Sequence, residues 1–268
     1  MQKLGINIDA MEDFNASVLK SDYKDTIKLI ATLGFGAIFS DMTFLKPPEK
    51  IAECCSKYSL EYQFIHAPFK NINDIWYEGL NGDQILKTLC DSVDASSRAN
   101  VPIIVVHVSS GFVPPPISKT GKERFKTLVS YAQNKNVKIA FENLRVPKYL
   151  KWAMDTFKDT SSVGFCWDIG HENCFTTGID FMSLYGDRLL CTHIHDNQKQ
   201  LGRDLHLIPF DGKIDFNHMA KRLKNSDYKG PLMLEVFSKN EIYDGVTTEQ
   251  FYTKAYNAAQ KIRNLILE

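Results

Sequence analysis

The sequence lacks any excess of charge and any long apolar run. Lysine plus arginine number 32 and aspartate plus glutamate number 32 in 268 residues, so the formal net charge is zero. A chain with no overall positive field has no general attraction for a polyanion, which argues against nucleic acid as a partner. No stretch approaches the roughly 20 apolar residues of a membrane span, and the opening residues hold no basic segment followed by an apolar one. We therefore expect a soluble, cytoplasmic protein that does not enter a membrane.

Paired cysteines and a glycine-rich turn are missing as well. The six cysteines show neither a CxxC pair nor the spacing of a disulfide framework, so reduced thiols are expected. Cys166 and Cys174 are interpreted as small buried thiols. The first apolar run, Leu4 to Ile8, continues as NIDAMEDF, which holds no glycine. That absence disfavours a doubly wound sheet with a phosphate-binding turn.

The chain does contain eight short apolar runs that alternate with segments of helical spacing. The runs expected as strands are Leu4–Ile8, Gly36–Ser40, Tyr62–Ala67, Ile103–Val108, Lys138–Glu142, Val163–Asp168, Leu189–His195 and Pro231–Val236. Helices are expected over approximately Asp25–Leu33, Pro47–Tyr58, Asp83–Ala99, Gly121–Gln133, Phe216–Leu223 and Glu249–Ile266, with another near Phe181. Because 44% of the residues are hydrophobic and no linker or composition shift interrupts the pattern, it predicts an α/β fold, a single (β/α)8 TIM barrel over residues 1–268.

Histidines and carboxylates are crowded into residues 191–216, CTHIHDNQKQLGRDLHLIPFDGKIDF. Alternation along the predicted strand puts His193 and His195 on one face, with His195 nearest the carboxyl end and His193 one layer deeper. Asp204 and His206 then share one side of an extended segment in the following loop. An ordinary core has no use for so many imidazoles and carboxylates, so the segment favours metal ligation.

Polar residues also end most of the other predicted strands. The candidate metal ligands are His66, His107, Glu142, Asp168, His171, His195, Asp204, His206 and Glu235. Active sites of TIM barrels lie at the carboxyl ends of the strands, whereas independent core histidines would scatter. Imidazole and carboxylate without thiolate suit a catalytic divalent cation, Zn²⁺ or Mn²⁺, with open coordination positions. Glu142 and Glu235 are costly to bury unpaired, and a cation between them explains their presence in apolar strands.

Five motifs carry a family resemblance: HAPF (66–69), ENL (142–144), WDIGHEN (167–173), the HIHDN segment with its D-x-H-L and FDGKIDF continuation, and LEVF (234–237). They resemble the sugar-phosphate isomerase/epimerase group of the xylose isomerase-like TIM barrels (AP endonuclease family 2) and, more distantly, endonuclease IV. One departure is the turn Pro209-Phe210-Asp211-Gly212, where the group has glycine at the second position.

The resemblance to the epimerases implies one metal ion held by the residues Glu142, Asp168, His195 and Glu235. It also implies that the two glutamates move protons. His171 would orient a substrate hydroxyl, or would complete a second metal site with Asp204 and His206. Endonuclease IV binds three zinc ions, and the nine candidate ligands match its ligand positions, so one to three ions are expected.

The leading hypothesis is a divalent-metal-dependent isomerase or epimerase that acts on a sugar or sugar phosphate by proton transfer through a metal-stabilised enediolate. Glu142, Glu235 and His171 would be its catalytic residues. The alternative is a zinc phosphodiesterase of the endonuclease IV kind that acts on abasic DNA. Such an enzyme needs a basic mouth, because phosphate contacts dominate DNA affinity, and the loops here are aromatic and slightly acidic.

Other activities remain open at this point. A lyase or dehydratase would keep the same ligands, and a barrel that binds metal without catalysis is a third possibility. The expected partner is a small sugar-like molecule, with Phe69, Trp76, Tyr77 and Phe112 as candidate walls of its site. A homo-oligomer is compatible with the sequence.

Overall fold

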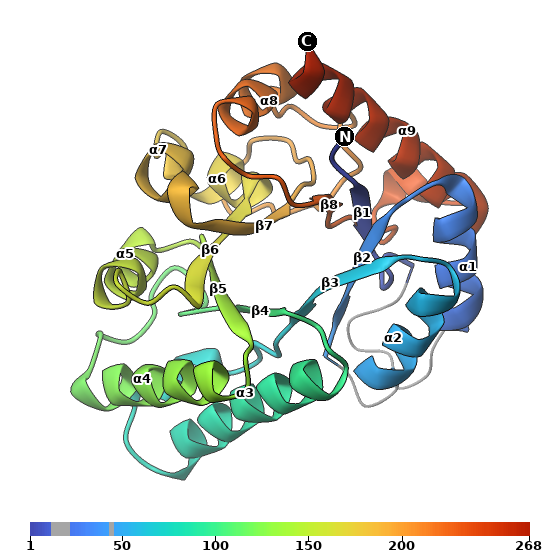
Figure 1. The fold of residues 1–268 in the computed structure, drawn as a ribbon. Coiled ribbons are helices and arrows are strands. Elements are labelled where there is room, and N and C mark those ends of the chain that lie inside the picture. Colours follow the sequence, from blue (N-terminus) through green and yellow to red (C-terminus); the bar gives the residue numbers. More distant parts are fainter. Residues whose placement is uncertain (12–21, 43–45) are drawn as a thin grey trace.

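The structure is a computed structural model that describes residues 1–11, 22–42 and 46–268. Eight parallel strands form a ring, and helices surround it (Figure 1). The strands are β1 (Leu4–Asn7), β2 (Ala37–Asp41), β3 (Glu61–His66), β4 (Ile103–Val106), β5 (Lys138–Glu142), β6 (Val163–Asp168), β7 (Leu189–His193) and β8 (Leu232–Leu234). Neighbouring strands follow the order β7-β6-β5-β4-β3-β2-β1-β8.

The ring closes between β7 and β8, next to Ile194. The N–H of Ile194 donates to the carbonyl of Met233 at 2.9 Å, and the N–H of Glu235 donates to the carbonyl of Ile194 at 3.1 Å. A closed parallel sheet with helices outside it is the (β/α)8 TIM barrel that the sequence predicts.

Helices follow the strands around the ring. They are α1 (Tyr23–Leu33), α2 (Pro48–Lys57), α3 (Leu80–Arg98), α4 (Lys119–Asn134), α5 (Pro147–Thr156), α6 (Ile169–Phe175), α7 (Phe181–Tyr185), α8 (Phe216–Lys224) and α9 (Thr248–Leu267), with 3₁₀ turns η1 (Ile72–Trp76), η2 (Gly186–Arg188) and η3 (Glu241–Tyr243). Their ends carry the expected signals: Thr247 and Gln250 form a capping box on α9, and Gly34 ends α1 with a φ of 100°. No helix in the described ranges is both long and apolar enough to cross a membrane.

Most of the core lies between the helices and the outer face of the sheet, while a smaller apolar cluster fills the barrel interior. The uppermost residues of this inner cluster are Phe39, Phe64, Val105, Ala140, Cys166, Cys191 and Met233. Because side chains alternate along a strand, the residue two positions later points inward again, one layer nearer the carboxyl end. Those residues are Asp41, His66, His107, Glu142, Asp168, His193 and Glu235. The fold therefore sets a polar layer directly on an apolar floor.

The predicted elements differ from the structure in three respects. Strands β4, β7 and β8 end two residues earlier than predicted, because the chain turns into loops there. Helix α5 was not predicted, although Pro147 occupies its first turn, where proline is favoured. Helix α6 was not predicted either. It begins directly after β6, with the Asp168 carboxylate accepting the N–H of His171 at 2.6 Å as its N-cap.

Candidate metal centre

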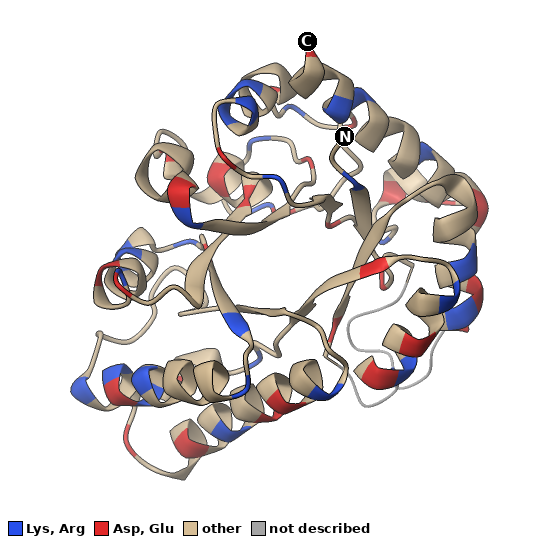
Figure 2. Ribbon diagram, viewed as in Figure 1, with Lys and Arg blue, Asp and Glu red and all other residues tan. Residues whose placement is uncertain are grey.

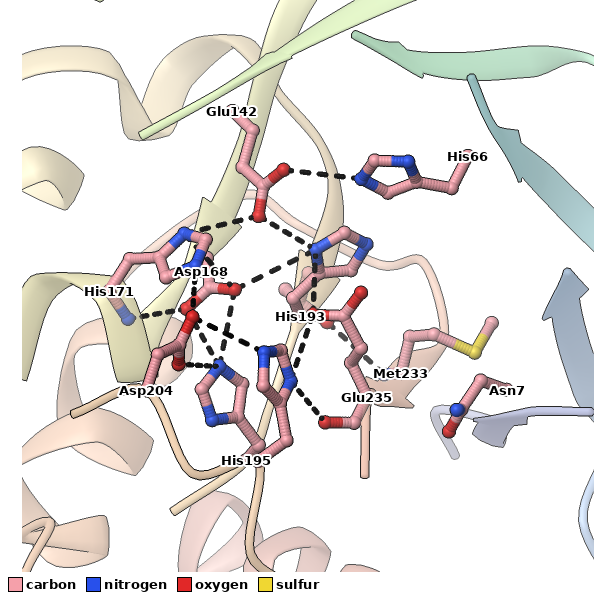
Figure 3. Close-up of polar contacts among 12 residues, drawn as sticks. Asn7, His66, Glu142, Asp168, His171, His193, His195, Asp204, Met233 and Glu235 are labelled. Carbon is pink, nitrogen blue, oxygen red and sulfur yellow. Dashed lines mark hydrogen bonds and ion pairs between the residues drawn. The ribbon is translucent and has the colours of Figure 1, made fainter. Parts of the chain in front are cut away.

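The carboxyl end of the barrel holds ten ionisable side chains in mutual contact, as Figure 3 shows for most of them. They are the carboxylates of Glu142, Asp168, Asp204 and Glu235 and the imidazoles of His66, His107, His171, His193, His195 and His206. Eight of them are buried, and Asp204 and His206 are half-buried. Six of the seven histidines in the chain are therefore in this cluster.

The centre of the cluster is a group of four residues from β5 to β8. One ligand atom each of Glu142, Asp168, His193 and Glu235 lie within 4.8 Å of one another. His193 Nδ1 lies 3.0 Å from Glu142 Oε1, 3.3 Å from Glu235 Oε2 and 3.8 Å from Asp168 Oδ2. Three carboxylates and one imidazole converging at this distance suit one divalent cation.

A second group lies on the β3–β4 side and shares Glu142. Its members are His66, His107 and Glu142. His107 Nε2 lies 2.7 Å and His66 Nε2 lies 3.5 Å from the same oxygen, Glu142 Oε2. One carboxylate thus faces imidazoles on both of its sides, with His193 on its other oxygen.

A third group lies toward the loop that follows β7. It contains His171, Asp204 and His206. The Asp204 Oδ2 atom lies 2.9 Å from His171 Nε2 and 3.3 Å from His206 Nε2. His195 stacks on His206 with ring centroids 4.0 Å apart, and its Nε2 atom lies 3.1 Å from Asp168 Oδ1. All nine candidate ligands are therefore brought into one cluster.

The grouping of the strand-seven histidines differs from the prediction. The resemblance placed His195 with the three carboxylates Glu142, Asp168 and Glu235, whereas the structure places His193 there. The cause is the register of β7: Cys191 lies in the apolar floor, so His193 is the residue of the next layer, and it pairs with Asp168 on β6. His195 belongs instead to a group with His206 and Glu235. Its role as a ligand stays a prediction.

One further residue of the layer was not predicted from the sequence. Asp41 ends β2, next to His66 on β3, and burial together with the neighbouring Asp9 raises the pKa of its carboxyl to about 7. Lys46 is buried and forms an ion pair with Asp9. The two-residue spacing from Phe39 in the floor is the signal that would have found Asp41.

Asp196 fixes the loop that carries Asp204 and His206. Its buried carboxylate accepts four backbone N–H groups, from Asn197, Phe210, Gly212 and Ile214, at 2.8 to 3.0 Å. Phe210 stands where the related turn has glycine, and it adopts a φ of 76°. The turn that glycine would allow is thus kept at the cost of local backbone strain.

The electrostatics of the cluster follow from burial and from mutual contact. Burial alone would raise the pKa of Glu142, but the imidazoles of His193 and His107 hold it well below its usual range. Burial lowers the pKa of His66, yet Glu142 more than offsets this effect and raises it to about 9. The pKa of His206 is raised to about 10, because Asp204 outweighs burial. The metal-free cluster therefore holds protons between its carboxylates and imidazoles.

The residues present fit a divalent metal ion. Two buried atoms of the cluster, His193 Nε2 and His195 Nδ1, make neither a hydrogen bond nor an ion pair with the described residues. A buried polar group without a partner costs about 1–3 kcal/mol, so a ligand that binds these nitrogens would stabilise the protein. The donors are imidazole and carboxylate, a set that suits zinc or manganese.

The mouth of the barrel has aromatic walls. Phe69 stacks on His107 with centroids 4.4 Å apart, and half-exposed Phe112 meets Phe175 edge to face, with centroids 5.8 Å apart. Trp76, by contrast, is 1% exposed and packs against Phe125 outside the barrel. Its expected place in a substrate wall is therefore wrong, because η1 turns it into the helix layer.

Sequence comparison identifies the family. Residues 27–263 match the model of the xylose isomerase-like TIM barrel. The chain belongs to this family. An uncharacterized protein of Sinorhizobium fredii is 27% identical to it over 203 residues, which are 69% of this chain and 61% of that protein.

Solved structures of other proteins have the same fold. A D-psicose 3-epimerase from Clostridium cellulolyticum H10, solved with D-tagatose, has a TM-score of 0.77 at 16% identity, with 99% of each chain covered. The IolI protein with a bound zinc atom has a TM-score of 0.76 at 18% identity, covering 99% of this chain and 98% of that one. A fusion of a xylose isomerase-like TIM barrel with 4-hydroxyphenylpyruvate dioxygenase has a TM-score of 0.77 at 13% identity. There 99% of this chain aligns with 43% of the fusion protein.

Proposed function

We propose that the protein is a divalent-metal-dependent isomerase or epimerase of a sugar-like carbonyl compound that works by proton transfer at carbon. The observation that carries the proposal is the pair of glutamates, Glu142 and Glu235. They come from β5 and β8, and their carboxylates approach within 4.8 Å in one group with His193 and Asp168. Sugar epimerases among the proteins of the same fold support the substrate class.

The glutamates are the proton carriers in this proposal. Each emerges from the apolar floor and is nearly buried, at 1% exposure for Glu142 and 7% for Glu235. Two carboxylates reaching one small bound molecule from different strands provide the two bases that an epimerisation needs, one for removal and one for return of the proton. His171, held by Asp204 at 2.9 Å, would orient a substrate hydroxyl.

Glu142, Asp168, His193 and Glu235 would hold the cation, zinc or manganese. When bound, it would polarise the substrate carbonyl and so lower the pKa of the adjacent carbon. A carboxylate of ordinary basicity is then sufficient as the base. The aromatic rings of Phe69 and Phe112 at the mouth would limit the entry of water.

Deuterium exchange tests the proposal. The metal-loaded protein is incubated with candidate ketoses in D₂O, and NMR follows deuterium at the carbon next to the carbonyl. We expect incorporation by the wild type and its loss in Glu142→Gln and Glu235→Gln. Glu241→Gln changes an exposed glutamate on η3 and serves as the matched control. Metal content is measured for each variant, so that loss of the base and loss of the ion are told apart.

One observation favours a second candidate, a metal-dependent phosphodiesterase of the endonuclease IV kind. The nine candidate ligands and His193 fall into neighbouring groups that share one centre, an arrangement that suits three ions. The distribution of surface charge argues against abasic DNA as the substrate, because positive and negative residues are interspersed along the helices around the ring (Figure 2). If no ketose exchanges while abasic DNA is cut in a metal-dependent manner, the isomerase proposal fails and this one replaces it.

A further inference from the structure

Arg145 lies three residues after Glu142, in the loop between β5 and α5 at the mouth of the barrel. Its Cζ atom lies 4.0 Å from the ring centroid of Phe175 and 5.8 Å from that of Phe112. The ring of Phe175 in turn lies 5.1 Å from that of His171. The guanidinium is therefore separated from the candidate metal ligands by a single aromatic ring.

The Arg145 guanidinium is held by its aromatic neighbours, and no described residue neutralises its charge. Over residues 1–11, 22–42 and 46–268, no carboxylate pairs with Arg145 and no carbonyl accepts a hydrogen bond from it. Other arginines of the chain differ in this respect. Arg222 pairs with Glu172 at 2.6 Å, and Arg188 donates to three backbone carbonyls at 2.9 Å. Arg145 thus keeps five N–H donors for which the described residues supply no acceptor.

The chemistry of the group that would use these donors is narrow. A guanidinium presents a planar fork that matches the two oxygens of a phosphate or a carboxylate. The contact with the face of Phe175 holds the guanidinium in place in advance, so less freedom is lost on binding. Phe112 is 50% exposed beside it, so this part of the wall faces solvent.

The alternative is that Arg145 has a purely structural role. A cation on an aromatic ring contributes about 0.5–1 kcal/mol at an exposed site, which is enough to keep Arg145 as packing. In that case its loss would lower stability slightly and leave ligand preference unchanged. If Arg145 binds an anion, its loss should change stability little and should strongly reduce the preference for anionic over neutral ligands.

We propose that Arg145 binds the anionic group, a phosphate ester or a carboxylate, of a substrate whose carbonyl end reaches Glu142 and Glu235. The sugar nature of that substrate rests on the proposed function, whereas recognition of the anion does not. Arg145 would then determine specificity, and neutral sugars would be the poorer ligands.

Calorimetric binding to the metal-loaded protein tests the inference with matched pairs of probes. The pairs are D-fructose with D-fructose 6-phosphate, and D-glucose with D-glucuronate, each measured again with inorganic phosphate as competitor. A charge-assisted hydrogen-bonded contact is worth roughly 1.5–3 kcal/mol, or about ten- to hundredfold in affinity. We expect the wild type to prefer one anionic probe by about that factor, and the two pairs tell phosphate from carboxylate.

Three variants complete the experiment. Arg145→Gln should abolish the preference while binding the neutral sugar as before. Arg145→Lys should retain part of it, because the charge remains and the fork is lost. Arg203→Gln removes an exposed arginine that bonds Gln200 in the loop after β7, and it should leave the preference intact. Melting temperatures of all three check the fold.

Two results would overturn the inference. One is equal affinity of the wild type for the charged and the neutral member of both pairs. The other is a preference that survives in Arg145→Gln, which would show that the metal centre alone holds the anion. If no sugar exchanges deuterium while the preference for an anionic probe depends on Arg145, the proposed function is refuted and this inference stands. If neutral sugars exchange deuterium and Arg145→Gln leaves the ligand preference unchanged, this inference is refuted and the proposed function stands.

Discussion

Replacing His193 by alanine should release a metal ion that replacement of His195 leaves bound. The Nδ1 atom of His193 lies 3.0 Å from Glu142 and 3.3 Å from Glu235, inside the group of three carboxylates. Of that group, His195 forms an ion pair only with Asp168, at 3.1 Å, and it otherwise belongs to a separate group with His206 and Glu235. Loss of a residue that merely supports a ligand costs roughly ten- to hundredfold in metal affinity. Loss of His193 as a ligand should cost at least that much.

His193→Ala should also lower the stability of the protein when no metal is bound. Carboxylate oxygens within 4.8 Å repel one another by about 3 kcal/mol per pair at an effective dielectric constant of about 20. In the metal-free protein His193 offsets this repulsion, because the carboxylates of Glu235 and Glu142 outweigh burial and raise its pKa. The metal-free His193→Ala protein should therefore unfold several degrees below the metal-free wild type, since each kcal/mol shifts the melting temperature by about 2–4 °C.

The assay compares metal content per chain after dialysis, and melting temperature with and without chelator, for both alanine variants and the wild type. Alanine removes an imidazole of similar burial in both variants, so each serves as the control for the other. Loss of the carboxylate-group ion from His195→Ala, together with its retention in His193→Ala, would show that His195 and not His193 is the ligand.

Two further predictions concern a glycine beside His195 and the pH dependence of stability. A Cβ atom at Gly170 would lie 1.8 Å from the His195 ring, so the ring must move by about 1.6 Å to reach the 3.4 Å of ordinary contact. In dialysis, Gly170→Ala should weaken binding of an ion to the group of His195, His206 and Glu235 and leave the ion of the carboxylate group bound, whereas Gly186→Ala, whose neighbour is a flexible side-chain end, should change neither. The pKa values of His66 and His206, raised to about 9 and about 10 from 6.5 in the unfolded chain, stabilise the metal-free protein most below about pH 6.5. Urea unfolding should find that this stabilisation disappears between pH 7 and 10 without metal but not with it, and a metal-free protein of constant stability over this range would contradict the assignment.

The fold could be predicted because each strand has its own local signal. The runs Lys138–Glu142 and Val163–Asp168 are strands with the predicted bounds. The strand ends were harder to predict. Val108 and His195 continue the alternating pattern of their strands but lie beyond the hydrogen-bonded ladder. The extent of that ladder depends on the neighbouring strands, which the local sequence does not show. Helix α5 was missed although proline at its first position was a readable signal.

The site could be predicted in its composition but not in its grouping. Position at a strand end, or in the segment directly after it, was enough to place nine residues in one cluster. Which of two histidines shares a layer with Glu142 depends on the register between β6 and β7, where the pairing shifts at a bulge between Phe165 and Cys166. A non-local pairing of this kind leaves no periodic trace in the sequence. The stacking of Arg145 on Phe175 likewise depends on a helix that was not predicted.

The apolar floor beneath the polar layer also limits the exchange of isotopes. Phe39, Phe64 and Met233 are at most 1% exposed, so solvent reaches the glutamates only from the mouth. A substrate seated there would cut that route while the proton is still on Glu142 or Glu235. The glutamate that removed the hydrogen would then often return it, and so restore the substrate, before the hydrogen meets water. Deuterium should accordingly enter the substrate more slowly than the carbon proton is removed, and a tritium label at that carbon should be partly retained in the recovered substrate.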